Sequence, residues 1–480
     1  MMFHVSGIFK KMDGNNDGFM DNPLSKQLNF MNIFKFQLHN GIEGMFGVNT
    51  LYDKKQGGQM KFQENKDKNI QNFYGTNMET TRIQIWNKTG YIFKQKPYQS
   101  MGLQTQFVYH QHDSYFGDRN YNGIEKSFYA NYIFESILGN TNHIYKVGAS
   151  FLYDDYKEDY NQLDFLKTEK VPGLFAEYTY KYLEKFTLVA GSRIDFHSIA
   201  GTQFTPRINI KYNPIEKTTL RISAGRSFRT ANILIENIQY FASNRNIEVD
   251  FNPINSSIQL NPEIAWNYGI SIAQEFKFLK RKSTIIADFF RTEFQNQVLV
   301  DLENARKIQF YNLNGKSFAN SFQIQWDFIP IQNLEARLAY KYYDVKSDYI
   351  SGKNSVPFVP KNRAFLNLAY STIPNDKQKN WTFDYTLQYV GEQRLPNTSD
   401  NLSVNQLPKN SSNYFVLNAQ IARNFSKNFR LYLGAENLGN YKQKKAIINA
   451  ENPFNNEFDA SFIYAPIMGT NLYIGIDVQL

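Results

Sequence analysis

The sequence contains no cysteine in its 480 residues. This excludes disulfide bonds, thiol catalysis and cysteine-based zinc sites. Long apolar runs are missing too, since no segment approaches the roughly eighteen consecutive apolar residues of a transmembrane helix, and a helical membrane protein is therefore excluded. The 53 basic and 44 acidic residues are interspersed, without the basic blocks of a nucleic-acid-binding protein. We expect no nucleic-acid partner.

Catalytic motifs and an export signal are also absent from the sequence. It has no Gly-x-Ser-x-Gly elbow, no His-Glu-x-x-His pair and no phosphate-binding loop, so we expect no enzymatic activity. Residues 1–11 lack the basic start, apolar core and cleavage site of a secretory signal, and alternate instead like a strand. We expect the natural chain to begin upstream of Met1 or the sequence to be a fragment.

The sequence does contain a repeated alternation of apolar and polar side chains at every second position. Each alternating stretch is roughly ten residues long and fits one membrane strand. The final stretch alternates Leu472, Ile474, Ile476, Val478 and Leu480 with Tyr473, Gly475, Asp477 and Gln479. The same rhythm recurs in 317–328, 334–342 and 381–389. Successive side chains of a strand point to opposite faces, so each stretch has one apolar and one polar face.

The polar face carries full charges, such as Glu335, Arg337 and Lys341. Charges suit a broad, water-filled lumen better than a small closed core. Aromatic residues, 16% of the chain, would form girdles at the two membrane surfaces. No shift in composition divides the chain. The sequence predicts one all-β domain over residues 1–480, a large antiparallel transmembrane β-barrel, with a soluble β-sandwich as the alternative.

Short and long connections alternate along the chain. The short turns lie at 213–216, 424–428 and around Asn140, and the long connections are predicted at 53–77, 154–171, 230–261, 391–413 and 439–459. In outer-membrane barrels the short turns face the periplasm and the long loops face outside. The count is about twenty strands, whereas large plugged transporters have about twenty-two, so we expect a barrel two strands short and incompletely closed.

Several segments resemble the barrel of TonB-dependent outer-membrane receptors, most closely the Bacteroidetes-type members. The similar segments are 204–207, 220–232, 262–269, 435–438, 458–461 and 464–469. They share the family's order over essentially the whole length. Nothing in the sequence corresponds to the family's N-terminal plug domain, so the chain resembles the C-terminal barrel portion.

The resemblance implies a cell outer-membrane location among outer-membrane lipid. It also implies energised import of a scarce, bulky solute, such as a siderophore, haem, cobalamin or another metal complex, with the TonB complex as partner of the full-length parent. A surface lipoprotein is a further candidate partner. The alternative is a passive, porin-like channel with a constriction loop folded inward.

Loop residues supply the candidates for contacting the solute, because capture at a barrel mouth needs aromatic platforms and hydrogen-bond donors. The candidates are Arg229, Asn237, Tyr240, Arg245, Gln393 and Arg394. Ordinary solvated loop residues are the competing interpretation. Arg207, Arg221 and Arg226 are predicted on the lumen wall, where they would face a plug or pair with wall carboxylates.

A possible structural Ca²⁺ loop lies near the N-terminus. Asp13, Asn15, Asp17 and Asp21 have the spacing of the first half of a calcium loop, with Gly18 at the sharp turn. Leu24 stands where the bidentate Glu is needed. A turn whose side chains bind their own backbone is the competing interpretation.

Two histidines form the last candidate. His110 and His112 share a face if their segment is extended, and Asp113 is adjacent in sequence. They could hold a metal chelate or support an outer-membrane hydrolase. Polar residues at a strand tip are the simpler interpretation.

Overall fold

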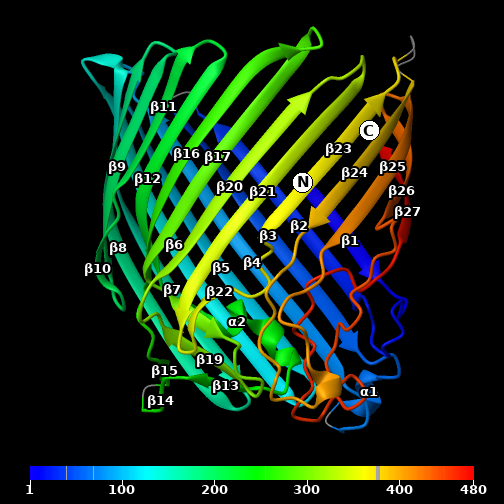
Figure 1. Cartoon of the computed structure of the whole chain (residues 1–480). Helices are drawn as coiled ribbons and strands as arrows, with labels where there is room; N and C mark the ends of the chain where they lie inside the picture. The colour runs from blue at the N-terminus through cyan, green and yellow to red at the C-terminus, as the bar shows by residue number, and fades with distance from the viewer. Residues whose placement is uncertain (39–40, 69, 255, 375–378, 480) are drawn as a thin grey trace.

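The computed structural model describes residues 1–38, 41–68, 70–254, 256–374 and 379–479. Leu480, the end of the last predicted strand, lies outside these ranges. The described chain is almost entirely strand and loop, and its long strands run side by side around a wide cylinder (Figure 1). The predicted fold class is confirmed.

The first half of the sheet is built from long strands. They are β1 (Met2–Ile8), β2 (Leu24–Gln37), β3 (Ile42–Gly58), β4 (Gly75–Ile92), β5 (Ser100–Phe116), β6 (Arg119–Leu138), β7 (Asn140–Tyr160), β8 (Leu163–Tyr182), β9 (Phe186–His197), β10 (Gly201–Phe204), β11 (Arg207–Ile215) and β12 (Thr218–Arg229). From β2 onward each pairs antiparallel with the strand before it, apart from β11, which pairs with β9.

The second half continues the same meander. Its strands are β16 (Glu263–Phe278), β17 (Arg281–Asn296), β20 (Ser317–Phe328), β21 (Leu334–Tyr349), β22 (Gly352–Ser355), β23 (Asn362–Ser371), β24 (Asn380–Val390), β25 (Tyr414–Ser426), β26 (Phe429–Glu436) and β27 (Asn471–Val478). The loops carry β13 (Asn246–Val249), β14 (Phe251–Asn252), β15 (Ser257–Ile258), β18 (Val298–Asp301), β19 (Lys307–Asn312), α1 (Glu64–Asp67), α2 (Ile233–Glu236), η1 (Ile238–Ala242) and η2 (Ser403–Asn405).

The main sheet has 22 members, but two pairs of these are single strands that are interrupted. β10 and β11 continue one register along β9 across Pro206, which has no N–H to donate. β22 and β23 both lie along β21. Counting each interrupted strand once leaves twenty, as the sequence predicts.

Side-chain alternation turns the apolar face outward. In β27, Leu472 and Ile474 are 71% and 72% exposed on the outer surface. Paired strands switch from aromatic to charged residues at one level: Phe128 lies opposite Tyr153, and two residues on, Lys126 lies opposite Asp155. This level marks the edge of the apolar band. The walls of β6 and β7 therefore project beyond the membrane on the loop side.

One predicted loop is wrong. Residues 154–171 are not a long connection but the ends of β7 and β8, joined by a two-residue turn at Asn161 and Gln162. The polar composition of this segment resembles a loop because its outer face meets water above the membrane, while its inner face carries buried polar groups such as Asp154 and Glu169.

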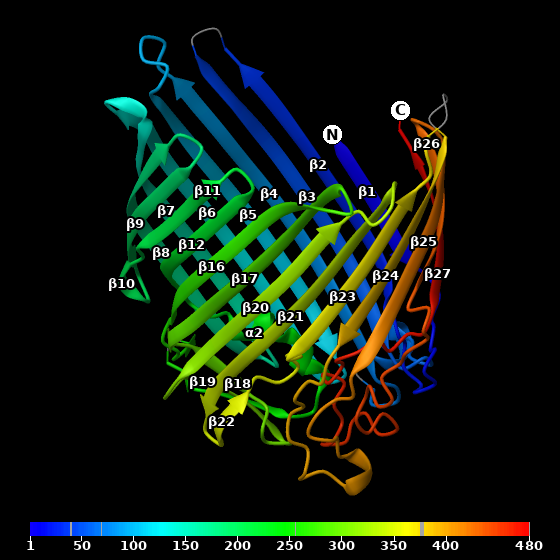
Figure 2. The same ribbon diagram turned by 45° about the horizontal axis from the view of Figure 1, so that its top comes forward.

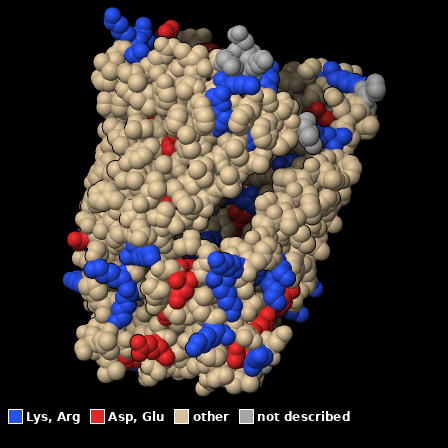
Figure 3. Space-filling view, turned by 90° about the vertical axis from the view of Figure 1, so that its right-hand side faces the viewer, with Lys and Arg blue, Asp and Glu red and all other residues tan. Residues whose placement is uncertain are grey.

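The sheet is not closed. Among the described residues, no pairing joins β1 to β27, which are the first and last strands of the meander. Figure 3 shows this side of the molecule hollowed between two walls, with charged side chains inside. In the described part of the chain, no helix has the length and apolar content needed to cross a bilayer.

Candidate functional site

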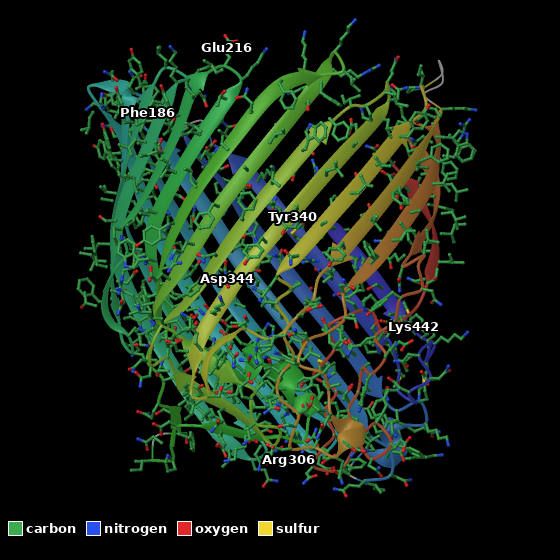
Figure 4. All side chains as sticks on the ribbon, in the orientation of Figure 1. Phe186, Glu216, Arg306, Tyr340, Asp344 and Lys442 are labelled. Atoms are coloured by element: carbon green, nitrogen blue, oxygen red, sulfur yellow. The ribbon has the colours of Figure 1, made fainter. Side chains whose placement is uncertain are left out.

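The long loops gather at one end of the barrel and the short turns at the other, as Figure 2 shows. Figure 4 places Arg306 and Lys442 at the loop end and Phe186 and Glu216 at the turn end. The candidate site is therefore the mouth formed by the loops.

The mouth is filled by an apolar cluster rather than left open. Ile233 and Leu234 of α2 and Phe241 of η1 are each 2% exposed, and they pack against wall residues such as Tyr121 and Phe165. Tyr121 and Phe165 belong to the inner face of β6 and β8 because their strand neighbours on either side point outward. The loop between β12 and β16 thus folds into the barrel, where Figure 1 shows α2.

Arg245 is the centre of the contacts between loops. The Arg245 side chain is 3% exposed, its Nε lies 2.9 Å from Asp459 Oδ2, and its Cζ lies 4.5 Å from the centre of the Phe462 ring. Nη1 donates to the carbonyl of Leu302 at 3.3 Å. Arg119 of β6 donates to the Arg245 carbonyl. Arg245 therefore contacts the loop before β27, the loop before β20 and the wall strand β6.

Backbone hydrogen bonds join the same two loops. Asn244 N donates to Phe458 O at 3.0 Å, and Ala460 N donates to Ala242 O at 2.9 Å. These two bonds flank an antiparallel bridge between Ser243 and Asp459. The loop after β12 and the loop before β27 are therefore locked side by side.

Two further ion pairs connect the remaining large loops to one another. Arg306 Nη2 lies 2.9 Å from Glu457 Oε1, and Arg394 Nη1 lies 2.6 Å from Glu303 Oε1. Glu457 also accepts from Asn405 Nδ2 at 2.7 Å. The bond from Asn405, with help from Arg306, holds the pKa of Glu457 below its ordinary value. The carboxylate therefore stays ionised in the assembled loops.

Two cavities lie near the mouth and in the wall below it. One, about 420 Å³, lies between the rim of β8 and the loop after β12, and its lining includes Lys167, Asn232 and Leu260. The other, about 580 Å³, lies against the lumen wall and is lined by Lys146, Glu177, Arg193, Arg207 and Arg226 among others. Both have polar and apolar lining, as a site for an amphipathic solute needs.

The lumen arginines largely pair with the wall. Arg207 Nη2 lies 2.5 Å from Glu177 Oε2, and Lys146 lies 3.9 Å from the same carboxylate. Arg226 donates to Gln203 Oε1 at 3.1 Å and to the carbonyl of Phe204. Arg221 stands opposite Ser271 in the sheet, on the same face as Arg207.

The predicted solute-binding residues fall into two groups. Arg229 is 57% exposed in its side chain and pairs with Glu263 and Glu236, while Asn237 and Tyr240 lie half-buried beside α2. Burial raises the pKa of Tyr240. Arg229 is therefore the one of these three whose side chain is largely open to solvent.

The second group is buried and already engaged. Arg245 is held as described, Gln393 is 4% exposed and donates to the carbonyl of Tyr464 at 3.3 Å, and Arg394 pairs with Glu303. These three side chains hold loops together in the closed arrangement. Their contact with a solute remains a prediction.

The two candidate histidines lie on one face of their strand and the neighbouring Asp113 on the other. His110 and His112 lie on the inner face of β5 with Val108, which is 4% exposed, whereas Asp113 belongs to the opposite face and accepts from Gln111 at 2.8 Å. Adjacent strand residues point in opposite directions, so the sequence neighbour is not a partner. His112 Nδ1 lies 2.9 Å from Thr80 Oγ1.

The calcium candidate is folded as a tight turn. Asp13 accepts from the backbone of Asp17 and Gly18, at 3.2 and 3.0 Å, and Asp21 accepts from Gly14 at 2.6 Å. Burial, reinforced by the neighbouring carboxylates, raises the pKa of Asp21. Within the described ranges, no group of three or more His, Cys, Asp or Glu side chains is placed to hold a metal ion. Calcium binding remains a prediction.

Sequence reasoning missed the partners of the loop arginines. Asp459, Glu457 and Glu303 lie far from Arg245, Arg306 and Arg394 along the chain. Asp459 belongs to one of the segments that resemble the receptor family, and this was the available signal. The resemblance placed it in a closing strand without giving it a partner.

Comparison with known proteins identifies the family. The family model described as TonB dependent receptor-like, beta-barrel matches residues 12–438. The chain belongs to the TonB-dependent receptor β-barrel family. Members of this family are outer-membrane β-barrels and are receptors rather than enzymes. No curated protein matches this TonB-dependent receptor barrel.

Solved structures agree with this barrel over nearly its whole length. The copper transporter OprC matches with a TM-score of 0.70 and 12% identity, covering 99% of this chain and 74% of its own. The siderophore receptor PiuA from Acinetobacter baumannii gives 0.66 and 14%, covering 99% and 76%. The ferric-catecholate import receptor Fiu from K12 E. coli gives 0.66 and 12%, covering 99% and 77%. At these identities the likeness shows the fold.

Proposed function

We propose that this chain forms the barrel wall and loop mouth of an energised outer-membrane importer for a scarce, bulky metal complex, with a siderophore complex as the first candidate. The observation that carries the proposal is the membership in the TonB-dependent receptor family over residues 12–438. The siderophore and copper receptors among the structural relatives support the metal-complex class.

The geometry of the mouth supports selective capture over open flow. The loop after β12 folds inward and packs an apolar cluster against the inner wall, so the loop end is narrowed by folded chain. A cavity of about 420 Å³ with Lys167 in its lining lies next to the cluster, and another of about 580 Å³ with Arg207 in its lining lies against the lumen wall. Cationic groups beside apolar surface suit an anionic, aromatic metal chelate.

We propose that the proton gradient of the inner membrane, acting through the TonB complex on the full-length parent, supplies the energy for import. A surface lipoprotein partner and a Ca²⁺ ion bound at Asp13, Asn15, Asp17 and Asp21 stay part of the proposal without support from the mouth geometry. The likeness to Bacteroidetes-type members belongs to the proposal as well.

The test is uptake by cells of the native host with the gene deleted. Iron and copper complexes, haem and cobalamin are supplied at nanomolar concentration, and accumulation of the labelled metal is followed with and without a protonophore. We expect the deletion to abolish uptake of one class and the restored gene to recover it. The protonophore should abolish the recovered uptake. Unchanged uptake in the deletion strain for every class would reject the proposal.

A passive channel is the second candidate, because the loop after β12 folds inward as a constriction loop would. The same experiment separates the two. Gene-dependent uptake that persists with the protonophore and rises linearly with solute concentration would favour the passive channel.

A further inference from the structure

A single charged side chain interrupts the apolar outer face of the wall from β23 to β27. Cross-strand pairing places Arg423 of β25 between Trp381 of β24 and Leu431 of β26, and Leu431 lies opposite Ile476 of β27. Trp381 is 41% exposed and Ile476 60%, which marks this face as the outer one. Among the described strand residues that point outward from β23 to β27, Arg423 is the only Lys, Arg, Asp or Glu.

We propose that Arg423, with the Trp381 ring beside it, binds the phosphate of an anionic phospholipid in the periplasmic leaflet of the outer membrane. The inference goes beyond the proposed import function, because it concerns the lipid side of the wall rather than the lumen. It needs only that this face of the wall lies in a bilayer.

The depth of Arg423 in the wall suits a lipid headgroup. Arg423 lies near the end of β25 at Ser426, where a short turn leads into β26, and short turns of outer-membrane barrels face the periplasm. Phe425 and Phe429 follow toward the turn, with ring centres 5.6 Å apart. Aromatic rings at this level mark the interface between hydrocarbon and headgroups. Figure 3 shows an outer wall that is largely uncharged below this end, where Lys and Arg side chains gather.

The protein leaves the charge of Arg423 unmatched. Its Cζ lies 5.0 Å from the centre of the Trp381 ring, and within the described ranges its side chain makes no ion pair or hydrogen bond. The neighbouring carboxylates belong to the other face, since Asp384 lies on the lumen side of β24 and Asp477 pairs with Arg430 there. A cation on the lipid side without a counter-ion is costly, and a lipid phosphate can supply the missing negative charge.

The chemistry of the site selects both the phosphate and the type of lipid. A guanidinium offers parallel N–H donors that match two oxygens of one phosphate. A zwitterionic headgroup would bring its own ammonium group, and the outward positions of these five strands hold no carboxylate to receive it. The acyl chains would lie on the next row toward the bilayer centre, where Phe383 and Leu433 are 39% and 53% exposed on either side of Ile421.

Arg291 of β17 shows that a ring contact alone does not create such a site. It also faces outward, at the loop end of the wall, and its Cζ lies 5.0 Å from the centre of the Phe318 ring. However, Arg291 Nη1 donates to Asn320 Oδ1 at 3.1 Å, and Nη2 lies 3.6 Å from Glu293 Oε1. The protein itself matches the charge of Arg291, so this residue provides a control with the same ring geometry.

Trp381 serves as the reporter in the test. The whole chain, with the other three tryptophans changed to Phe, is placed in phosphatidylcholine vesicles. A small, equal fraction of brominated phosphatidylglycerol, phosphatidylethanolamine or phosphatidylcholine is then included. We expect brominated phosphatidylglycerol to quench Trp381 several-fold more than brominated phosphatidylcholine does, and phosphatidylethanolamine to behave like phosphatidylcholine. Arg423→Gln should make all three equal, and Arg423→Lys should keep a weaker preference, because lysine retains the charge without the paired donors.

Arg291→Gln is the matched control and should leave the preference unchanged. Heat-modifiable gel migration verifies that each variant is folded. Equal quenching by phosphatidylglycerol and phosphatidylcholine with Arg423 present, or an undiminished preference in folded Arg423→Gln, would overturn the site. Equal enrichment of phosphatidylethanolamine would overturn the choice of an anionic headgroup.

Inorganic phosphate distinguishes a lipid from a soluble anion. We expect it to leave the quenching by brominated phosphatidylglycerol unchanged, because free phosphate lacks the chains that place the lipid beside Phe383 and Leu433. Displacement of the lipid by inorganic phosphate, and not by the same ionic strength of chloride, would reassign the site to a free anion and overturn the lipid. The measurement uses no transported solute, so its failure would leave the import function standing.

Discussion

At the scale of single residues, buried charge organises the mouth. Arg245 and Asp459 are 2% exposed each, and their opposite charges lie 2.9 Å apart, from Nε to Oδ2. The sequence could mark Arg245 as a loop residue with donors to offer. It could not show that these donors are occupied, because the partner lies on another loop whose position is set by the tertiary fold.

Acid should loosen the contact between the two C-terminal loops through Glu457. The folded-state pKa of Glu457 lies below its ordinary value, so its stabilising contribution is complete above the ordinary pKa of about 4.3 and is lost as the pH falls through the folded-state value. Spin labels at Val404→Cys and Glu451→Cys, both exposed, should separate as the pH falls below the ordinary pKa of a glutamate.

Glu457→Gln serves as the control for this titration. It keeps an oxygen that can accept from Asn405 but cannot titrate, so the pH-dependent change in distance should largely disappear. The same acid transition in both proteins would show that another group is responsible.

Gly148 is a residue whose missing side chain is required by the wall. An added Cβ would lie 2.2 Å from the carbonyl oxygen of Tyr132 on the neighbouring strand, which cannot move without breaking the ladder. Gly148→Ala should destabilise the barrel by about 1–3 kcal/mol, as overpacking does. Gly102→Ala, in β5, meets nothing nearer than 3.7 Å and should change little. Urea unfolding followed by heat-modifiable gel migration compares the two, and equal midpoints would contradict the account.

At the scale of elements, alternation in the sequence predicts most strands because the two faces meet different solvents. β20, β21, β24 and β27 fall where the rhythm places them. The alternation fails for the ends of β7 and β8, because the outer face there carries polar residues such as Asp155, Lys157 and Thr168. The small strands β13, β18 and β19 were not predicted, since their pairing depends on loop packing within the mouth.

The edge of the apolar band gives the sharpest test at this scale. Leu174 and Leu166 lie on the same outer face of β8 and are 58% and 47% exposed, but Leu174 lies within the band and Leu166 beyond it. Leu174→Arg should cost about 2–4 kcal/mol of unfolding free energy in lipid if it lies near the bilayer midplane, and Leu166→Arg about 0–1. Unfolding by guanidinium in lipid vesicles measures both. Equal costs at the two positions would place the membrane elsewhere.

At the scale of the whole molecule, twenty strands form one meander with an unpaired first and last strand in the described structure, and the loops close one end. Fold class and approximate strand number follow from the sequence, because they depend on local rhythm and on turns. The closure of the mouth does not, because it depends on contacts between loops such as Ser243 with Asp459. The family membership then links the wall to import.

The central claim is that one face of the wall lies in lipid and the other in the lumen. The chain has four tryptophans, of which Trp326 and Trp381 share the outer face with Phe322 and Phe383, whereas Trp86 lies over Gly47 on the inner face. Single-tryptophan variants, with the other three changed to Phe, can be placed in vesicles of brominated lipid.

Fluorescence quenching in these vesicles is the most direct measurement. We expect strong quenching of Trp326 and Trp381 by brominated lipid and weak quenching of Trp86, with aqueous iodide giving the opposite order. Quenching of Trp86 by brominated lipid as strongly as the other two, or of none of the three, would contradict it.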